Sequence, residues 1–238
     1  MPEYALTKAL VEMGCKPAIV AGHSVGEYAA LAAAGVLDYG HALWLIHSRG
    51  RLMATAGEVA PGGMAAVLGL DDEEVARCCR EAGGTVVVAN YNSPGQVVIS
   101  GDKESLEKAT ELCKAAGAKR CIPLAVSGAF HSPLVREANE SLAANINKTI
   151  FRDAEIPVVT NYDGVAHTSG ETIRKNLLMQ MESSVQWAKT MKAIEEFGVD
   201  AIVEVGPGSV LSGLAKRIVP DIPTVQVGTA AELLQFKC

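Results

Sequence analysis

A short serine motif between two glycines carries the strongest chemical signal in the sequence. The motif GHSVG at residues 22–26 follows an apolar run at residues 18–21 and opens an Ala-rich stretch at residues 26–35. A sharp turn between a strand and a helix exposes such a serine as a nucleophile, and the glycines leave room for the turn. The helix N-terminus adds unpaired N–H groups beside it. We therefore predict Ser24 as the nucleophile and the Val25 N–H as an oxyanion donor.

A serine needs a base to attack at neutral pH, and the sequence offers five histidines. His131 lies in a predicted loop between a strand and a helix, a position that suits a catalytic base. His23 adjoins the nucleophile, but we expect its side chain to point away from Ser24. The remaining histidines fall in helical patterns or in a polar turn and are expected to have no catalytic role: His41, His47 and His167.

An anion anchor is the third chemical element. Arg49 lies in a predicted helix 25 residues after Ser24, and a buried guanidinium can hold a carboxylate with two hydrogen bonds. The pattern alone also fits an exposed charge on a helix surface, for Arg49 and for Arg51 alike. Both interpretations stay open on the residue types alone.

Strand-like and helix-like stretches alternate along the chain, which predicts an α/β fold with a mostly parallel sheet covered on both faces. Between residues 58 and 125 the order is strand, helix, strand, strand, helix, strand, as in a ferredoxin-like unit. We therefore expect a small domain of residues 58–125, inserted into a larger domain of residues 1–57 and 126–238. Asp71, with Glu74 as capping-box partner, is predicted to begin one small-domain helix.

The individual elements are expected as follows. Helices are predicted at residues 4–13, 26–35, 41–54, 71–82, 102–116, 133–148, 170–182, 184–197 and 209–218. Strands are predicted at residues 18–21, 64–68, 85–89, 96–100, 118–125, 156–161, 200–205 and 223–227.

Composition excludes several classes of protein. The 238 residues are 49% hydrophobic and 20% charged, so a packed core is expected and a disordered chain is not. The net charge of −6 gives no basic excess for binding nucleic acid, and no uninterrupted apolar run reaches the ~18 residues of a membrane span. The six cysteines form no C-x-x-C pair, which argues against a zinc site and a compact disulfide framework and favours a reducing, cytoplasmic compartment.

Six motifs together extend the signal over most of the chain. In order, they are GHSVGEYAALAAAGVL, HSRGRLM, ANYNSPGQVVISG, GAFHSPLV, SVQW and VEVGPGSVLSGLAKR. From about residue 4 to about residue 228 the combination closely resembles malonyl-CoA:acyl-carrier-protein transacylases and the acyltransferase domains of fatty-acid and polyketide synthases. The resemblance implies an α/β-hydrolase-like large domain, a ferredoxin-like small domain and an active site between them.

The resemblance also assigns roles to residues. Ser24 matches the serine that accepts the acyl group, and His131 matches the general base. Arg49 matches the arginine that pairs with the free carboxylate of malonyl. Gln186 matches the residue whose main-chain carbonyl orients the histidine, in place of the aspartate of a Ser-His-Asp triad.

Three further positions are implied near the substrate. Phe130, which precedes the histidine, is expected to narrow the acyl pocket and disfavour a branching methyl group. Asn90 and Asn92 match a loop near the cleft. A local basic rim for polyanionic partners is expected to draw on exposed lysines and arginines: Arg51, Lys189, Lys216 and Arg217.

The resemblance implies transfer of a malonyl group from malonyl-CoA to the phosphopantetheine thiol of acyl carrier protein, through a malonyl-serine, in fatty-acid biosynthesis. No metal or other cofactor and no nucleic-acid or membrane partner is expected. One alternative is an impaired remnant or scaffold that binds carrier protein. Another is a serine esterase or thioesterase, which would normally place its histidine near the C-terminus, whereas His131 lies mid-chain.

The family pattern also leads us to expect that this chain is truncated. Family members begin with a strand and a Gly-Gln-Gly-Ser-Gln loop ahead of the serine motif, and this sequence does not contain that segment. The loop supplies the family's second oxyanion donor, and losing one such donor typically lowers the rate by ~10²–10³. A transit peptide for a mitochondrion or plastid is the alternative to a cytoplasmic location.

Overall fold

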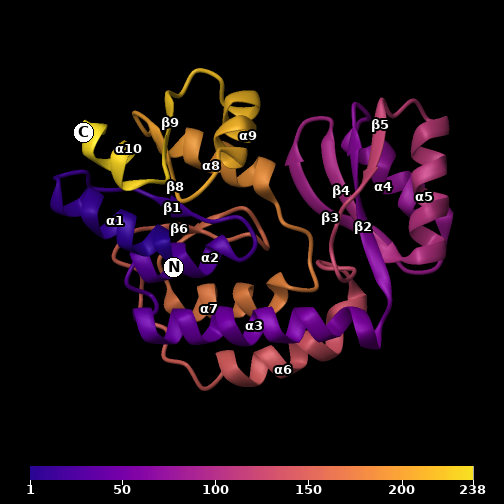
Figure 1. Ribbon diagram of the computed structural model, residues 1–238, viewed down its shortest axis with the longest axis horizontal. Helices are drawn as coiled ribbons and strands as arrows, with labels where there is room; N and C mark the ends of the chain where they lie inside the picture. The colour runs from indigo at the N-terminus through magenta and orange to yellow at the C-terminus, as the bar shows by residue number, and fades with distance from the viewer. Residues whose placement is uncertain (238) are drawn as a thin grey trace.

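The computed structural model describes residues 1–237 and has an α/β architecture of two units (Figure 1). The larger unit begins with α1 (Pro2–Glu12), β1 (Val20–Ala21), α2 (Gly26–Ala33) and α3 (Tyr39–Val59). The smaller unit contains β2 (Gly62–Leu68), α4 (Asp72–Ala82), β3 (Val86–Ser93), β4 (Gln96–Asp102), α5 (Lys103–Ala115) and β5 (Arg120–Pro123). The chain then returns to the larger unit through η1 (Pro133–Val135), α6 (Arg136–Ile146), β6 (Val158–Val159), β7 (Ala166–His167), α7 (Gly170–Gln180), α8 (Trp187–Phe197), β8 (Ile202–Val205), α9 (Val210–Ile218), β9 (Thr224–Val227) and α10 (Ala230–Gln235).

The smaller unit is an antiparallel sheet in the order β3-β4-β2-β5, with α4 and α5 on one face (Figure 1). Its core lies between that face and the two helices. Asp71 caps α4 by accepting the N–H groups of Glu73 and Glu74, as predicted. The reciprocal half of the capping box is wrong, because the Glu74 carboxylate pairs with Arg77 on the same helix.

The larger unit differs from the single, mostly parallel sheet that the alternating pattern predicts. Within residues 1–237 its strands form two sheets, one in the order β1-β6-β7 and one of β8 with β9. The pairs β1–β6 and β8–β9 are parallel, whereas β6–β7 is antiparallel. β7 was not predicted, since two residues are too few to show alternation, and α10 was not predicted either.

Four helices of the larger unit enclose its main core. Side chains of α2, α3, α6 and α7 form this core, and α3 packs lengthwise along α6, which lies below it in Figure 1. Fully buried side chains from each helix meet here: Leu31, Leu45, Leu142, Ile173 and Leu177. α3 is longer than the predicted 41–54, because Asp38 caps it at one end and it runs on to Val59. This long helix carries Arg49 into the interior.

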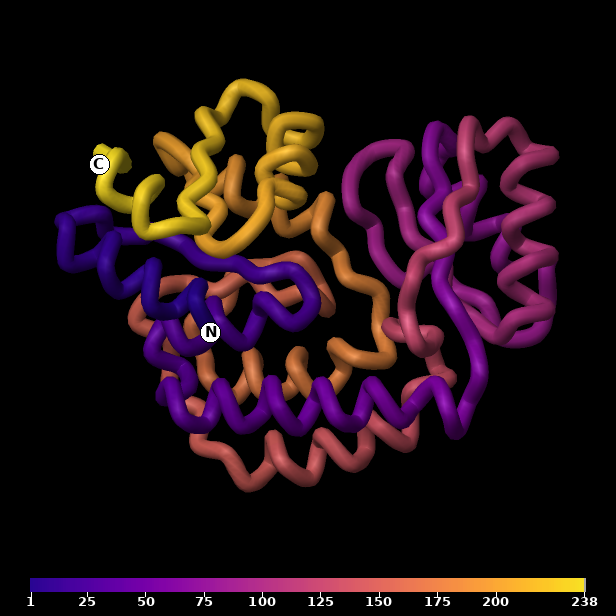
Figure 2. The backbone as a smooth tube through the Cα atoms, viewed as in Figure 1, coloured from indigo at the N-terminus to yellow at the C-terminus, as the bar shows by residue number. Residues whose placement is uncertain are grey.

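The chain crosses between the units twice, at two places that touch. Figure 2 shows the end of α3 leading into β2 and the segment after β5 returning beside it. A side chain on Gly57 would place its Cβ 1.6 Å from the Ser127 carbonyl oxygen, so only glycine allows this approach. The contact fixes where the return segment, which leads directly to His131, leaves the smaller unit.

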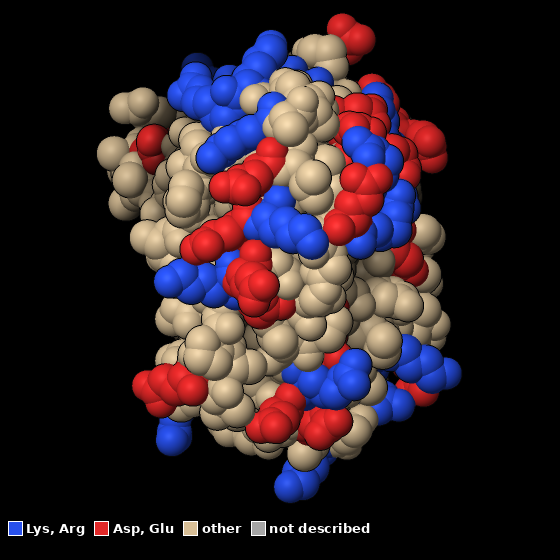
Figure 3. Space-filling view, turned by 90° about the vertical axis from the view of Figure 1, so that its right-hand side faces the viewer, with Lys and Arg blue, Asp and Glu red and all other residues tan. Residues whose placement is uncertain are grey.

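The surface carries both signs of charge. Figure 3, which views the end formed by the smaller unit, shows basic and acidic side chains interspersed. On α4, for example, Arg77 pairs with both Glu74 and Glu81. No helix within residues 1–237 is long and apolar enough to cross a membrane.

Gly57→Ala tests the contact between the two crossings. We expect the variant to lose about 1–3 kcal/mol of unfolding free energy, since the methyl group collides with a backbone carbonyl. Denaturant unfolding measures the loss. Gly50→Ala is the matched control on the same helix, because a Cβ there meets nothing within 4 Å, and we expect it to be neutral or to gain about 0.5–1 kcal/mol. Equal behaviour of the two variants would contradict the packing described.

Candidate active site

Ser24 lies at the turn between β1 and α2, as the sequence predicts. Its backbone has a φ of 51°, in the left-handed region that residues with a side chain rarely adopt. Gly22 makes the turn possible, because a Cβ at that position would lie 2.1 Å from the Gly26 carbonyl oxygen. The turn directs the Ser24 hydroxyl away from the helix and toward the side chains of two distant segments.

His131 is one of those side chains. Its Nε2 lies 2.8 Å from Ser24 Oγ. On the other side of the ring, Nδ1 lies 3.0 Å from the Gln180 carbonyl oxygen and 3.1 Å from the Ser183 carbonyl oxygen. Because carbonyl oxygens only accept, the proton sits on Nδ1 and Nε2 is left to accept the proton of the serine hydroxyl.

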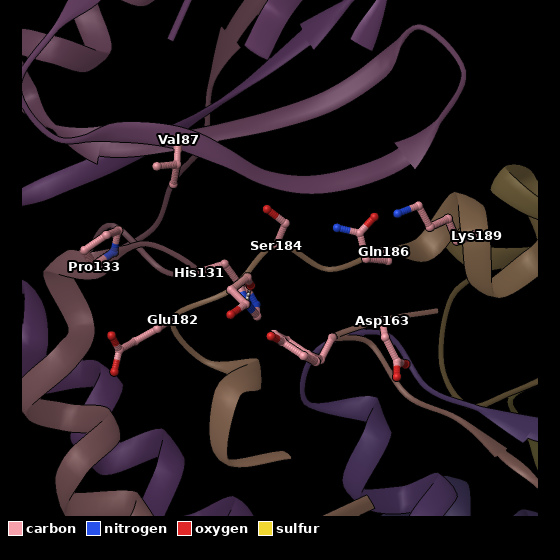
Figure 4. Close-up of a pocket in the computed structure, with 10 residues that line it drawn as sticks. Val87, His131, Pro133, Asp163, Glu182, Ser184, Gln186 and Lys189 are labelled. Carbon is pink, nitrogen blue, oxygen red and sulfur yellow. Dashed lines mark hydrogen bonds between the residues drawn. The ribbon is translucent and has the colours of Figure 1, made fainter. Parts of the chain in front are cut away.

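The assignment of Gln186 as the residue whose carbonyl orients His131 is wrong. The Gln186 carbonyl accepts the N–H and the hydroxyl of Thr190, because Gln186 caps the start of α8. Gln180 takes this role instead. It is the last residue of α7, where carbonyl groups have no partner within the helix, and its carbonyl also accepts the Ser183 N–H over 3.3 Å. Figure 4 places Gln186 between Ser184 and Lys189, to one side of His131.

Arg49 is the second side chain at the serine. It is 4% exposed, and its Nη2 donates to Ser24 Oγ over 2.9 Å. Its Nε has no partner, and the guanidinium forms no ion pair with any carboxylate of residues 1–237. The alternative of an exposed helix charge is therefore wrong for Arg49. A buried cation without an anionic partner is costly unless a ligand supplies one.

Burial also tunes the base. The pKa of His131 falls to about 3, first because the ring is removed from water and second because the Arg49 charge lies nearby. The imidazole is therefore neutral at pH 7, and burial lowers the pKa of Arg49 as well without making it a base at that pH. The site thus holds a neutral proton acceptor and a fixed positive charge around one hydroxyl.

The Val25 N–H stands at the N-terminus of α2, beside the serine. Within residues 1–237 this N–H has no hydrogen-bond partner, and Val25 precedes the first residue of the helix. The helix dipole adds partial positive charge at the same point. The group is therefore available to a developing oxyanion.

The remaining predicted residues lie along the seam between the two units. Asn92, on β3, accepts a hydrogen bond from Nε2 of His23 over 2.9 Å, so His23 points away from Ser24 as expected. Asn90 is buried and forms a parallel bridge with Val185 of the larger unit. Phe130 packs against the cores of both units. Among residues 1–237, the hydrogen bonds of the Ser24 Oγ atom go to His131 and Arg49 and not to these residues.

A cavity of about 560 Å³ opens beside His131. Figure 4 shows its lining from both units, with Val87 above and Asp163 below. Lys189 and Gln186 line the cavity from the start of α8, and Pro133 lines the side opposite Lys189. The cavity gives a ligand of extended shape access to His131. Among residues 1–237, no group of three or more His, Cys, Asp or Glu side chains is placed to hold a metal ion.

Residues 2–233 match the acyl transferase domain family. The chain belongs to this family. It is 47% identical over 221 residues to the malonyl CoA-acyl carrier protein transacylase of Escherichia coli K12, covering 92% of this chain and 72% of that protein. It is 44% identical over 232 residues to the Salmonella typhimurium transacylase of the same name, covering 96% and 75%.

Solved structures agree with the sequence relatives. An acyl carrier protein S-malonyltransferase from Vibrio cholerae superposes on this acyl transferase domain with a TM-score of 0.95 at 42% identity, covering 99% of this chain and 78% of that one. A malonyl-transacylase in complex with its type II PKS acyl-carrier protein superposes with a TM-score of 0.93 at 43% identity, covering 98% and 77%.

Sequence reasoning missed the polar residues behind the site of this acyl transferase. Asn161 holds the backbone of Ser24, and Gln180 holds both Ser24 and His131. Glu27 accepts hydrogen bonds from the backbone N–H of Asn161 and from the side-chain amide of Gln180. The end of a predicted helix at residue 182 signals free carbonyl groups near Gln180, but nothing in the residue types shows that they face His131. Only the tertiary fold brings residues 24, 131 and 180 together.

The lowered pKa of His131 predicts how the rate of acylation depends on pH below pH 7. We expect acylation of Ser24 to keep its kcat/KM from pH 7 to about pH 5, whereas a histidine with the ordinary pKa of about 6.5 would lose roughly thirty-fold. Rapid-quench measurement of acyl-enzyme formation at each pH tests this.

A matched melting curve at each pH is needed as a control. The unfolded chain binds a proton to His131 below about pH 6.5, whereas the folded chain does not until about pH 3. His131 therefore lowers stability as the pH falls through this window. An acid limb near pH 6.5 in a protein that is still folded would contradict the burial of the base.

Proposed function

We propose that this chain transfers a malonyl group from malonyl-CoA to the phosphopantetheine thiol of acyl carrier protein, through a malonyl ester of Ser24. The observation that carries the proposal is the double contact at Ser24 Oγ, which His131 and Arg49 reach at 2.8 and 2.9 Å. The first makes the hydroxyl a nucleophile, and the second places a cation where the free end of a dicarboxylic acyl group needs a partner. Relatives 40–47% identical are named as malonyl CoA-acyl carrier protein transacylases.

Acylation follows from the geometry. Ser24 Oγ attacks the thioester carbonyl carbon while His131 Nε2 takes the hydroxyl proton. The carbonyl oxygen becomes an oxyanion against the Val25 N–H. When the C–S bond breaks, the CoA sulfur takes the proton from His131, and the malonyl group remains on Ser24.

The imidazolium that forms on His131 needs compensation, and no carboxylate lies against its Nδ1. The carbonyl groups of Gln180 and Ser183 accept the Nδ1–H instead. Gln180 ends α7, so the negative end of that helix dipole also faces the ring. This arrangement holds the tautomer firmly and stabilises the charge less than an aspartate does.

Arg49 selects acyl groups that carry a carboxylate. The malonyl carboxylate supplies the anion that this buried guanidinium lacks, through a geometry suited to two hydrogen bonds. Neutralising Arg49 also removes the positive charge that depresses the pKa of His131, so the base becomes stronger when the correct acyl group is bound. A neutral acyl group leaves the Arg49 cation unpaired and the pKa of His131 depressed. Phe130, packed beside the base, leaves little room for a branch on that group.

Transfer to the carrier protein reverses the acylation with a different thiol. His131 removes the proton of the phosphopantetheine thiol, the sulfur attacks the ester carbonyl, and Ser24 Oγ recovers the proton. CoA and carrier protein present the same pantetheine arm, and the cavity beside His131 gives one entrance for both. The kinetics are therefore ping-pong, in the setting of fatty-acid biosynthesis.

Carrier protein docking requires local positive charge, because the chain as a whole has a net charge of −6. Lys189 lines the cavity, and Arg217 hydrogen-bonds Gln96 across the two units. Lys216 and Arg51 do not line this cavity, and their part in the rim stays a prediction from the sequence. The relative solved with its acyl-carrier protein shares this fold at 43% identity.

Two finer structural inferences accompany this function. We infer that the smaller unit is ferredoxin-like, which is supported by its antiparallel order β3-β4-β2-β5 and its two helices on one face. We infer an α/β-hydrolase-like larger unit from the strand–serine–helix turn at β1 and α2. A cytoplasmic location remains a prediction from cysteine usage, as does the absence of a cofactor.

Malonyl-CoA labelling tests the reaction. Incubation with malonyl-CoA is expected to add one malonyl mass to the peptide that contains Ser24, and Ser24→Ala is expected to abolish the adduct. Mass spectrometry of a proteolytic digest locates it. A folded protein that forms no adduct would support the scaffold alternative, and rapid release of free malonate without transfer would support the esterase alternative.

Arg49→Ala tests the selectivity. We expect the ratio of malonyl to acetyl labelling of Ser24 to fall at least about a hundred-fold, since a charge-assisted pair is worth roughly 1.5–3 kcal/mol and the variant also relieves a neutral acyl group of a buried cation. Arg77→Ala, an exposed arginine on α4, is the control and should leave the ratio unchanged. If malonyl preference persists in Arg49→Ala, the anchor lies elsewhere.

A further inference from the structure

The elbow helix carries a carboxyl group that no step of the reaction uses. Glu27 follows Ser24 by three residues, in the first turn of α2, and is fully buried. No cation pairs with it among residues 1–237. A buried carboxyl without an ion pair is expensive, so its hydrogen bonds must compensate for the loss of water.

Both hydrogen bonds of Glu27 converge on one atom. Its Oε2 accepts the backbone N–H of Asn161 over 3.1 Å and the side-chain amide of Gln180 over 2.8 Å. Asn161 follows β6 and Gln180 ends α7, so a single oxygen ties two separate segments to the elbow.

Those two residues are the ones that hold the nucleophile. The Asn161 side chain accepts the Ser24 N–H over 2.6 Å and donates to the Gly22 carbonyl over 2.7 Å. The Gln180 amide donates to the Ser24 carbonyl over 2.9 Å. The backbone of Ser24, strained at a φ of 51°, is thus held on its N–H and on its carbonyl.

Gln180 also holds the base, through its own carbonyl on His131 Nδ1. Its side-chain amide therefore hydrogen-bonds the Ser24 carbonyl, while its main-chain carbonyl accepts the Nδ1–H of His131. Whatever fixes the Gln180 side chain fixes the distance between nucleophile and base.

We propose that Glu27 is a positioning residue for acyl transfer: its Oε2 locks the Gln180 amide and Asn161 so that Ser24 and His131 form one rigid unit. The proposal rests on the transfer reaction inferred above for Ser24. It assigns to the Gln180 side chain, separately from its carbonyl, the task of holding the serine backbone.

The role depends on an accepting oxygen and not on negative charge. Burial raises the pKa of Glu27 to about 7, and the second oxygen, Oε1, has no hydrogen-bond partner. A proton on Oε1 leaves Oε2 free to accept both N–H groups. A glutamine at this position can do the same with its single oxygen, whereas an apolar side chain leaves two buried donors unsatisfied.

Three variants separate positioning from general stability. Glu27→Gln keeps the accepting oxygen, Glu27→Leu removes it at similar size, and Gln180→Ala removes only the side-chain grip while the carbonyl on His131 remains. We expect Glu27→Gln to acylate within about threefold of wild type, and the other two to lose about ten- to a hundred-fold in the acylation rate constant. The KM for malonyl-CoA should stay unchanged, because Arg49 is untouched.

A second reagent distinguishes this proposal from the proposed function. A fluorophosphonate that labels activated serines reports on the Ser24–His131 pair without any carboxylate, and its labelling rate should fall in parallel with acylation. The double variant Glu27→Leu/Gln180→Ala should lose no more than the worse single variant, since both break one unit. A wild-type protein that reacts with the fluorophosphonate but not with malonyl-CoA would refute the transfer reaction alone.

Asn139→Ala is the matched control. Asn139 is a buried amide on α6 that also grips the end of α7, through the Leu178 carbonyl and Glu182, but it contacts neither Ser24 nor His131. We expect it to lower the melting temperature and leave both labelling rates within about threefold of wild type. If Asn139→Ala slows labelling as much as Gln180→Ala, or if Gln180→Ala labels at the wild-type rate, the proposal is wrong. If Glu27→Leu does not fold, the comparison of labelling rates between Gln180→Ala and Asn139→Ala tests the proposal.

Discussion

Ser24 and His131, the proposed nucleophile and base, are the two non-glycine residues among residues 1–237 whose backbones adopt a positive φ. Ser24 has a φ of 51° and His131 a φ of 56°. Each such conformation costs on the order of 1–3 kcal/mol and persists only where surrounding contacts hold it. At Ser24 those contacts are hydrogen bonds to its N–H and its carbonyl, and at His131 they are two carbonyls on one ring nitrogen. The short contact between the two side chains depends on both.

Because backbone carbonyls and not a carboxylate accept the Nδ1–H of His131, its pKa is controlled by burial and by Arg49. A carboxylate partner raises the pKa of a histidine and stabilises its charged form strongly. Here burial and the Arg49 charge lower the pKa of His131, and two neutral carbonyls compensate only in part. The resting site is therefore poor at holding a proton, and an incoming carboxylate that neutralises Arg49 corrects this. In the proposed mechanism, selectivity for the acyl group and strength of the base are linked through the Arg49 guanidinium.

The sequence predicts the side chains that touch the reacting atoms and fails on the groups that hold them. Ser24 and His131 are predicted from residue type and local pattern, whereas residue type leaves Arg49 open and only the family resemblance assigns it. The resemblance points to Gln186 and not to Gln180, because the role belongs to a main-chain carbonyl, which every residue possesses. Position at a helix end decides which carbonyl is free, and only the packing of α7 decides which one faces the ring.

The fold shows the same division. The smaller unit follows from local signals, because capping aspartates and alternating strands specify each antiparallel neighbour. The separation of β8 and β9 from β1, β6 and β7 follows from tertiary packing, which no periodicity records. Glu27 belongs to this second class: its sequence position suggests an exposed charge at a helix start, and the fold buries it completely.

The segment after α7 connects these observations. Val185 donates to the Ala89 carbonyl and accepts from the Tyr91 N–H, so this segment adds an edge contact to β3 of the smaller unit. Ser184 donates to the Val88 carbonyl at the same seam. The residue before it, Ser183, accepts the His131 Nδ1–H through its carbonyl. Since peptide units are stiff, a shift of β3 displaces the carbonyl that orients the base. The smaller unit is therefore linked to His131 through the backbone of residues 183–185.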